Sequence, residues 1–139
     1  MPESYEEIAE MMDHWGLSKS PQEVGWVLAT DPDRRIRTLV EVSRGSVQGM
    51  DVHIPSVLQA VLLSGSDRWA YIHNHPSGNP AASAVDLDLM ETLREASELC
   101  GLYLEDGLVL TSDPNRFSSL LLEGTYTPRP YPGVVVDAA

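Results

Sequence analysis

Hydrophobic and polar positions along the chain follow two different periods, and these periods separate strands from helices. Val24–Thr30 is apolar almost throughout, which is typical of a buried strand. Arg35–Val42 alternates polar and apolar side chains, as a half-buried strand does. This alternation puts the carboxylate of Glu41 on the face opposite Val40 and Val42. The turn residues between the two segments predict a hairpin.

Three further segments show the spacing of apolar side chains that indicates helices. The first is short and amphipathic, the second follows Pro55, which suits the first turn of a helix, and the third ends at Gly101. Each has one apolar face to pack against a sheet. The predicted ranges are 4–14, 56–64 and 83–100, and the inward-facing positions of the last two are Val57, Leu58, Val61 and Leu62, then Leu89, Met90, Leu93, Ala96, Leu99 and Cys100.

The remaining apolar runs predict more strands. The bulky run from Trp69 to Ile72 is typical of a buried strand, and short strands are expected at 102–105 and 107–111. Residues 117–122 are expected to form a strand or a short helix. Because strands and helices are interleaved, we expect a mixed α/β domain with a central sheet flanked by helices.

Length and composition fit one domain, since 139 residues with 42% hydrophobic content are enough to bury a core. We expect residues 1–22 to form an N-terminal helix and a link, and residues 23–123 to form the main domain. From Gly124 onward the sequence is rich in proline. We therefore expect residues 124–139 to be an extended tail, either disordered or lying on a sheet edge of its own or a neighbouring copy.

The charge balance disfavours nucleic-acid binding. The net charge is −12, from 21 acidic and 9 basic residues, and the basic residues form no run that would contact phosphates. The acidic surface could favour a basic partner, but a diffuse excess of this kind more often only keeps a protein soluble.

The single cysteine and the lack of long apolar runs bear on the compartment. Cys100 can form no internal disulfide, and we expect it to be buried and unreactive. No segment has the basic and then apolar pattern of a signal peptide, and no apolar run approaches about 18 residues. The sequence therefore predicts a cytoplasmic protein that does not cross a membrane.

Candidate chemistry is concentrated between residues 73 and 86. His73 and His75 are two positions apart at the end of a strand, so their side chains should point the same way. Pro76 and the turn after it reverse the chain, and Asp86 falls in the first turn of the next helix. Two imidazoles and one carboxylate suit Zn²⁺, and three protein ligands leave a position for water, as catalytic zinc sites do.

Each part of this segment also has a simpler interpretation. Ser83 and Asp86 have the spacing of a capping box, which starts many helices without further function. A histidine at the end of a strand is more often structural than a metal ligand. The metal hypothesis depends on the two patterns occurring together at this spacing.

The whole string, H-x-H-P-x6-S-x-x-D from His73 to Asp86, resembles without a gap the metal-binding signature of the JAMM (MPN+) metalloprotease family. It is most similar to the RadC branch, which shares the H-N-H-P-S-G-N-P run, and the resemblance extends over roughly Val24 to Leu120. It implies that residues 23–123 form an α/β catalytic domain of the MPN/JAB type (cytidine-deaminase-like), with one Zn²⁺ held by His73, His75 and Asp86.

The resemblance also implies an upstream glutamate that acts as acid and base. Composition leaves the choice open among Glu23, Glu41, Glu91, Glu98, Glu105 and the acidic residues near the N-terminus. RadC-like chains have a glutamate three residues before an Arg-Gly pair, and Glu41 holds that position before Arg44-Gly45. Ser83, by analogy with the serine of the family, would donate a hydrogen bond to the oxyanion. His53 is expected to be structural or to support the ligands from outside.

The function that the resemblance implies is zinc-dependent hydrolysis of peptide or isopeptide bonds by a metal-activated water. The expected partner is a protein or peptide substrate, which includes ubiquitin-like conjugates or precursors. The alternative is a RadC-like accessory protein of DNA repair or of mobile elements that hydrolyses nothing. A scaffold that only binds partners is disfavoured because every signature position is filled. Gly107, where RadC-like chains usually have His, and Ala82, where Pro is frequent, depart from the pattern.

Overall fold

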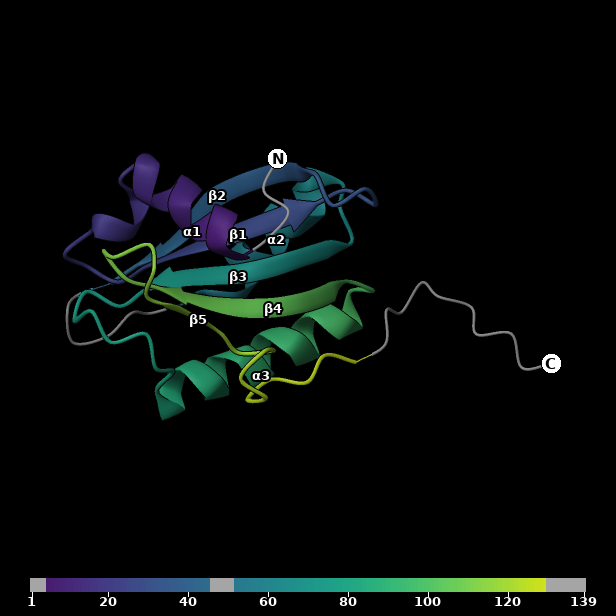
Figure 1. Cartoon of the computed structure of the whole chain (residues 1–139). Helices are drawn as coiled ribbons and strands as arrows, with labels where there is room; N and C mark the ends of the chain where they lie inside the picture. Colours follow the sequence, from purple (N-terminus) through teal and green to yellow (C-terminus); the bar gives the residue numbers. More distant parts are fainter. Residues whose placement is uncertain (1–4, 46–51, 130–139) are drawn as a thin grey trace.

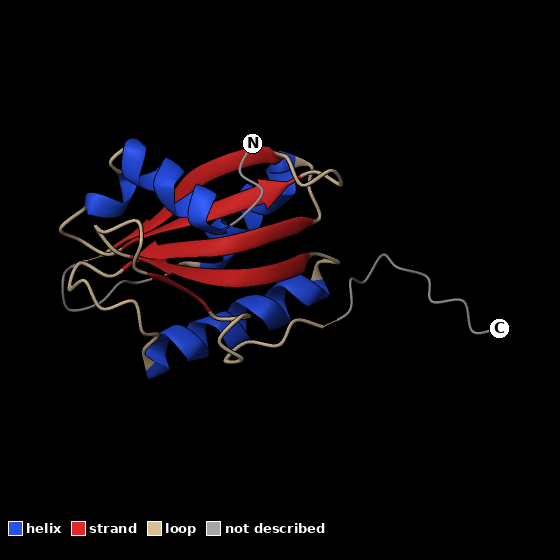
Figure 2. Ribbon diagram, viewed as in Figure 1, coloured by secondary structure: helices blue, strands red, loops and turns tan. Residues whose placement is uncertain are grey.

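Five strands form one mixed sheet, and helices pack on both of its faces (Figures 1 and 2). The structure is a computed structural model that describes residues 5–45 and 52–129. The strands lie in the order β2-β1-β3-β4-β5. They are β1 (Val24–Thr30), β2 (Ile36–Arg44), β3 (Arg68–Asn74), β4 (Tyr103–Leu110) and β5 (Phe117–Ser119). The α/β class and the central mixed sheet that the sequence predicts are confirmed.

The pairing between neighbouring strands changes from antiparallel to parallel at β3. β1 is antiparallel to both β2 and β3, whereas β3 and β4 are parallel. A parallel pair needs a crossover connection, and α3 (Ala84–Leu99) provides it. The chain therefore leaves the end of β3 through a loop, enters α3 and returns as β4.

The sheet separates two apolar layers. α1 (Tyr5–His14) covers one face, where Ala9 and Met12 are buried against strand residues such as Ile72. α2 (Ile54–Ser64) and α3 cover the other face, where Trp69 lies at the centre of the larger core. The short 3₁₀ helix η1 (Leu17–Lys19) links α1 to β1. None of the helices in the described ranges is long and apolar enough to cross a membrane.

The predicted hairpin of β1 and β2 is confirmed. The Asp31 carboxylate closes the turn by accepting hydrogen bonds from the N–H groups of Asp33 (2.9 Å) and Arg35 (2.8 Å). In β2, Ser43 pairs with Gly25 and Glu41 pairs with Trp26, so one extra residue bulges between these pairs.

The inward-facing positions predicted for α2 and α3 are partly wrong. Leu62 in α2 and Leu99 in α3 have exposed fractions of 53% and 90%. Cys100 is exposed as well, not buried as expected. In α3 the buried positions are Met90, Leu93 and Ser97, because Ser97 takes the inward position and accepts a hydrogen bond of 3.0 Å from Nε1 of Trp69.

Residues 103–110 form one strand, β4, rather than the two strands that the sequence predicts at 102–105 and 107–111. The register of β4 against β3 shifts just before Asp106, which is 1% exposed. The Asp106 carboxylate accepts hydrogen bonds from the N–H groups of Gly107 (2.7 Å) and Leu121 (2.9 Å) and from the hydroxyl of Ser119. The hydrogen-bonding groups of Asp106, which lies between the two predicted strands, are thus satisfied within the fold, and β4 continues through this residue.

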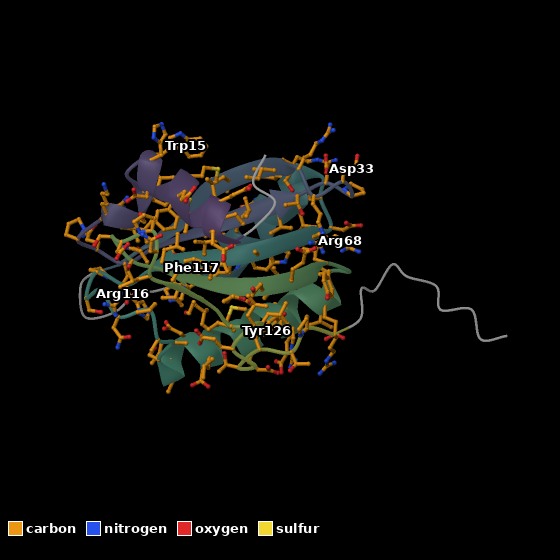
Figure 3. All side chains as sticks on the ribbon, viewed as in Figure 1. Trp15, Asp33, Arg68, Arg116, Phe117 and Tyr126 are labelled. Atoms are coloured by element: carbon orange, nitrogen blue, oxygen red, sulfur yellow. The ribbon has the colours of Figure 1, made fainter. Side chains whose placement is uncertain are left out.

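The segment after β5 packs against the domain as far as it is described. Tyr126 is 5% exposed, belongs to the larger core, and donates a hydrogen bond of 2.6 Å to the Leu104 carbonyl (Figure 3). Part of the expected tail is therefore packed against β4. Residues 130–139 lie outside the described part of the chain, and the expectation for them stays a prediction.

Candidate metal centre

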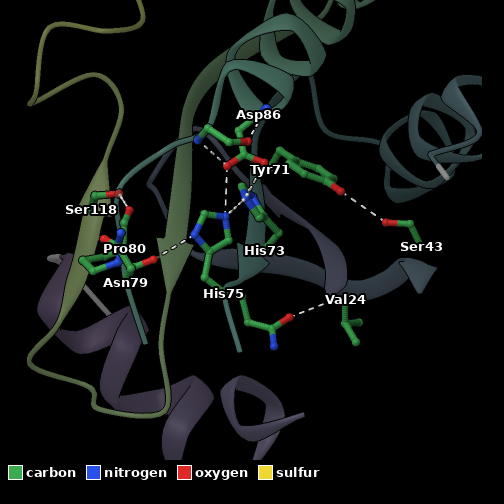
Figure 4. Close-up of polar contacts among 11 residues, drawn as sticks. Val24, Ser43, Tyr71, His73, His75, Asn79, Pro80, Asp86 and Ser118 are labelled. Atoms are coloured by element: carbon green, nitrogen blue, oxygen red, sulfur yellow. Dashed lines mark hydrogen bonds and ion pairs between the residues drawn. The ribbon is translucent and has the colours of Figure 1, made fainter. Parts of the chain in front are cut away.

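The two histidines and the aspartate of the motif converge at one point (Figure 4). Nε2 of His73 lies 3.2 Å from Nε2 of His75. The Asp86 carboxylate lies 3.2 Å from Nε2 of His73 through one oxygen and 2.9 Å from Nε2 of His75 through the other. Their side chains are 3%, 12% and 11% exposed, so the group is nearly enclosed but reachable.

The end of β3 explains why both imidazoles face the same side. His73 lies in β3, and the backbone N–H of His75, just beyond the strand, still donates to the Leu110 carbonyl of β4 at 2.8 Å. The chain therefore stays extended through His75, and the alternation of side chains holds. The predicted placement of the two histidines on one side is confirmed by the distance between their rings.

The loop after β3 fixes the ring of His75. Nδ1 of His75 lies 2.8 Å from the Asn79 carbonyl, which can only accept, so Nδ1 carries a proton and donates. The Pro80 carbonyl accepts a hydrogen bond of 2.6 Å from the buried hydroxyl of Ser118, which ties this loop to β5. Nε2 of His75 is thereby left to face the carboxylate or a metal, in the manner of metal-binding histidines.

Asp86 is both a candidate ligand and a helix cap. The Ser83 hydroxyl accepts from the Asp86 N–H at 3.1 Å, and the Asp86 carboxylate accepts from the Ser83 N–H at 2.9 Å. This reciprocal pair is the predicted capping box at the start of α3. The cap and the ligand functions coexist because one carboxylate oxygen still faces His73 while the other serves both Ser83 and His75.

Electrostatics in the cluster favour a proton on the histidine side. The hydrogen bond to Asp86 raises the pKa of His75, although burial opposes it. Burial alone would raise the pKa of Asp86, but hydrogen bonds from His73 and His75 outweigh burial and hold that pKa well below its usual value. Both nitrogens of His75 face acceptors, Asn79 and Asp86, in agreement with the raised pKa of this ring. The negative charge of Asp86 that favours this proton would also favour a bound metal cation.

The group fits zinc by donor chemistry and by spacing. Two imidazole nitrogens and a carboxylate oxygen are common zinc ligands. With Zn–N distances of about 2.0–2.1 Å, two ligand atoms of a tetrahedron lie about 3.3 Å apart. The separations of 3.2, 3.2 and 2.9 Å are close to that edge. Nδ1 of His73 is buried without a hydrogen-bond partner among the described residues, whereas Nε2 of the same ring faces Asp86 and His75.

Glu41 is not brought into this cluster. It pairs with Trp26 in the sheet and forms an ion pair with Arg44, and its side chain is 44% exposed. Trp26 faces the α1 layer, whereas Gly25 pairs with His73. Strand alternation therefore puts Glu41 on the opposite face of the sheet from the histidines. The prediction that it emerges opposite Val42 agrees with this, since Val42 packs on the α2 and α3 side.

Glu23 lies on the same face of the sheet as the two histidines. It directly precedes β1, two residues before Gly25, which pairs with His73. The pairing itself ends at Gly25 and His73, and extending its antiparallel register by two residues would set Glu23 opposite His75. The Glu23 charge also contributes, after larger causes, to the raised pKa values of His75 and Tyr71. The sequence signal that would have found it is its position immediately before the strand that pairs with the histidine strand.

The other two residues singled out from the sequence have structural positions. His53 is exposed, caps the N-terminus of α2, and its Nδ1 lies 2.7 Å from the Ser56 hydroxyl. Gly107 has no room for a side chain, because a Cβ there would lie 2.6 Å from the Met90 sulfur. Met90 of α3 thus fills the space beside β4 where a larger residue at 107 would otherwise lie.

Comparison with known proteins agrees with this geometry. The family model described as "RadC-like JAB domain" matches residues 2–125. The chain belongs to the RadC-like JAB domain family. The match covers the sheet, the helices α1, α2 and α3, and the histidine and aspartate cluster. The candidate site therefore lies within the residues that define the family.

Several curated relatives of this RadC-like domain carry the name UPF0758 protein. One from Desulforudis audaxviator is 32% identical over 101 residues, which are 73% of this chain and 43% of that protein. One from Geobacter sulfurreducens is 30% identical over 111 residues, 80% of this chain and 48% of that protein. The chain therefore spans less than half the length of these relatives. Their name states no activity.

Proposed function

We propose that this RadC-like domain is a zinc-dependent hydrolase of amide bonds, acting as a metallopeptidase or isopeptidase. The observation that carries the proposal is the convergence of His73, His75 and Asp86 at the spacing of a tetrahedral zinc site. Three protein ligands leave a fourth position for water or substrate, which distinguishes a catalytic from a structural zinc site. The partial exposure of His75 and Asp86 gives a substrate access to that position.

A zinc ion held by these three side chains would act as a Lewis acid and make hydroxide available near neutral pH. We assign the proton transfer to Glu23, which accepts the proton that the attacking water loses and returns it to the leaving amine. The Ser83 hydroxyl accepts from Asp86, so its own hydrogen is free to donate to the oxyanion of the tetrahedral intermediate. Such a bond is typically worth about 3 kcal/mol.

The choice of Glu23 in place of Glu41 rests on the faces of the sheet. Glu41 lies on the α1 side and is engaged by Arg44, so it would have to cross the sheet to reach the histidines. Glu23 lies on the histidine side at the end of β1. A general base needs to come within hydrogen-bond reach of the proton that it removes, and Glu23 is the glutamate that the register brings towards His75.

The substrate that we propose is an extended protein segment, with conjugates or precursors of ubiquitin-like proteins as the first candidates. The experiment incubates zinc-loaded protein with a panel of ubiquitin-like fusions and unfolded peptides, beside a chelated control. Cleavage that depends on zinc supports the proposal. If no member of the panel is cleaved by protein that demonstrably holds one zinc per chain, the accessory function without hydrolysis is favoured.

A matched pair of variants then identifies the proton carrier. Glu23→Gln keeps the shape of the side chain but cannot accept a proton, so turnover should fall by about 10²- to 10⁴-fold while zinc is retained. Glu41→Gln is the same change on the other face and should leave turnover unchanged. The opposite result for the two variants would restore Glu41 as the catalytic glutamate.

A further inference from the structure

Asn74, between the two histidines, has its side chain on the other face of the sheet and is completely buried. Its amide makes three hydrogen bonds to one short segment of chain. Oδ1 accepts from the Val24 N–H at 2.7 Å (Figure 4), and Nδ2 donates to the carbonyls of Ser20 at 3.2 Å and Gln22 at 3.0 Å. The partners fix the orientation of the amide, because an N–H needs the oxygen and two carbonyls need the NH₂ group.

These bonds hold the backbone on both sides of Glu23. Gln22 and Val24 are its direct neighbours, and the Val24 bond occurs where the main-chain pairing of β1 with β3, which begins at Gly25 and His73, has ended. The Asn74 side chain thus continues the connection between the two strands by one further residue. The backbone of Glu23 is also bonded to the segment that follows β2, because its carbonyl accepts a hydrogen bond of 2.9 Å from the Gly45 N–H.

We propose that Asn74 is a positioning residue that sets the place of Glu23 relative to His73, His75 and Asp86. Because Asn74 is the residue between the two histidine ligands, any shift of the ligand strand is transmitted directly to the segment that carries Glu23. Only an amide of this length suits the role: aspartate has no donor for the two carbonyls, and alanine has neither donor nor acceptor. This inference rests on the proposed role of Glu23.

The test measures position directly, without a substrate. Pseudocontact shifts of isotope-labelled protein loaded with Co²⁺ report where each nucleus lies relative to the metal. In the unmodified protein, Glu23 and Val24 should give one large, defined set of shifts. In Asn74→Asp the shifts of Glu23 should move or average, while those of Asp86 and of the Trp69 indole N–H stay in place. Asn74→Ser loses the same bonds without burying a charge, so it guards against a variant that does not fold, and its Glu23 shifts should move as well.

Ser97→Ala is the matched control, since it also removes a buried hydrogen bond, the one to Trp69, but lies away from Glu23. It should lower the melting temperature without moving the Glu23 shifts. Unchanged Glu23 shifts in a folded, Co²⁺-loaded Asn74→Asp would overturn the role of Asn74 while leaving the metal site standing. The lack of pseudocontact shifts anywhere near Asp86 would instead overturn the metal site and this inference with it.

Turnover on any cleaved member of the panel gives a second reading. Asn74→Asp should lower kcat by about 100-fold with KM changed little, because a displacement of about 1 Å is enough for such a loss. In a Glu23→Gln background the same substitution should cost almost nothing further, since the group that it positions is already disabled. An equal fold-loss in both backgrounds would mean that Asn74 acts only on the stability of the fold.

Discussion

The hydroxyl groups of Ser43 and Tyr71 meet at 3.1 Å across the strand that lies between them. Ser43 is in β2 and Tyr71 in β3, with β1 and its Gly25 between these strands, and Figure 4 shows the bond between the two hydroxyl groups. A Cβ at Gly25 would lie 2.1 Å from the Tyr71 hydroxyl oxygen and 2.4 Å from the Ser43 oxygen. This hydrogen bond, one end of which lies in the strand that carries His73, therefore depends on glycine at position 25.

Gly25→Ala should destabilise the protein at the upper end of the range for overpacking, about 3 kcal/mol, because Tyr71 is fully buried and cannot move aside. Ser43→Ala, which removes one buried hydrogen bond, should cost about 1 kcal/mol. When Ser43→Ala and Tyr71→Phe are already present, both oxygen atoms are gone and Gly25→Ala should cost clearly less. Denaturant unfolding of these variants measures the coupling, and strict additivity would contradict the steric explanation.

Purified protein should hold about one zinc per chain. His73→Ala, His75→Ala and Asp86→Ala should each strongly reduce that content, because each removes one of three converging ligands. Glu41→Gln and His53→Ala serve as controls and should keep the metal. Elemental analysis after dialysis makes the comparison, and full zinc in all three ligand variants would exclude the site.

The metal-free protein should show a pH window set by Asp86 and His75. The lowered pKa of Asp86 stabilises the fold fully above its unfolded value of about 3.9, and this stability is lost as the pH falls through the folded value. The raised pKa of His75 stabilises the fold fully below about 6.5, and this part is lost as the pH rises through the folded value.

Asp86 and His75 together therefore stabilise the metal-free protein most between about pH 4 and 6.5, by an amount on the order of 1 kcal/mol. The measurement is the difference in unfolding free energy between the unmodified protein and Asp86→Asn, with EDTA present, across this range and up to pH 9. A difference that does not decline above pH 6.5 would contradict the charged pair. Glu41→Gln, which affects an exposed ion pair, should give a small and nearly constant difference.

Binding to DNA at about 0.15 M salt should be negligible. Phosphate contacts need clustered cations, and the chain has 9 basic residues among 21 acidic ones. Several of the arginines are also engaged in ion pairs, as Arg44, Arg68 and Arg94 are with Glu41, Glu105 and Glu91. A gel shift at low micromolar protein that weakens steeply with salt would reverse this conclusion and favour a role in repair.

The candidate metal ligands were predictable because they belong to one contiguous stretch. His73 and His75 follow from strand alternation, and Asp86 follows from the start of a helix, so local rules suffice for all three. Leu62 and Leu99 show the limit of such rules. Both fit the apolar face of a helix, but whether the sheet reaches far enough to cover them depends on tertiary packing.

The position of Glu23 beside the histidines was not predictable from local pattern because it depends on a pairing between distant strands. Which glutamate faces the histidines follows from the register of β1 against β3, where Gly25 lies opposite His73. Glu41 satisfies the same alternation within its own strand but pairs with Trp26 and faces the other layer. Register of this kind is set by the packed core, which a single sequence does not display.

His73, His75, Ser83 and Asp86 are carried by one uninterrupted strand, loop and helix start, whereas Glu23 arrives from a separate hairpin and is joined to them by the amide of Asn74. The candidate metal ligands and the proposed proton carrier therefore belong to separate parts of the chain and can change independently. We therefore expect that a related protein with a displaced segment at 20–24 would keep the complete histidine and aspartate signature and still lack hydrolytic activity. The histidine and aspartate signature alone therefore identifies a candidate metal site, and it does not report whether a glutamate is held beside that site.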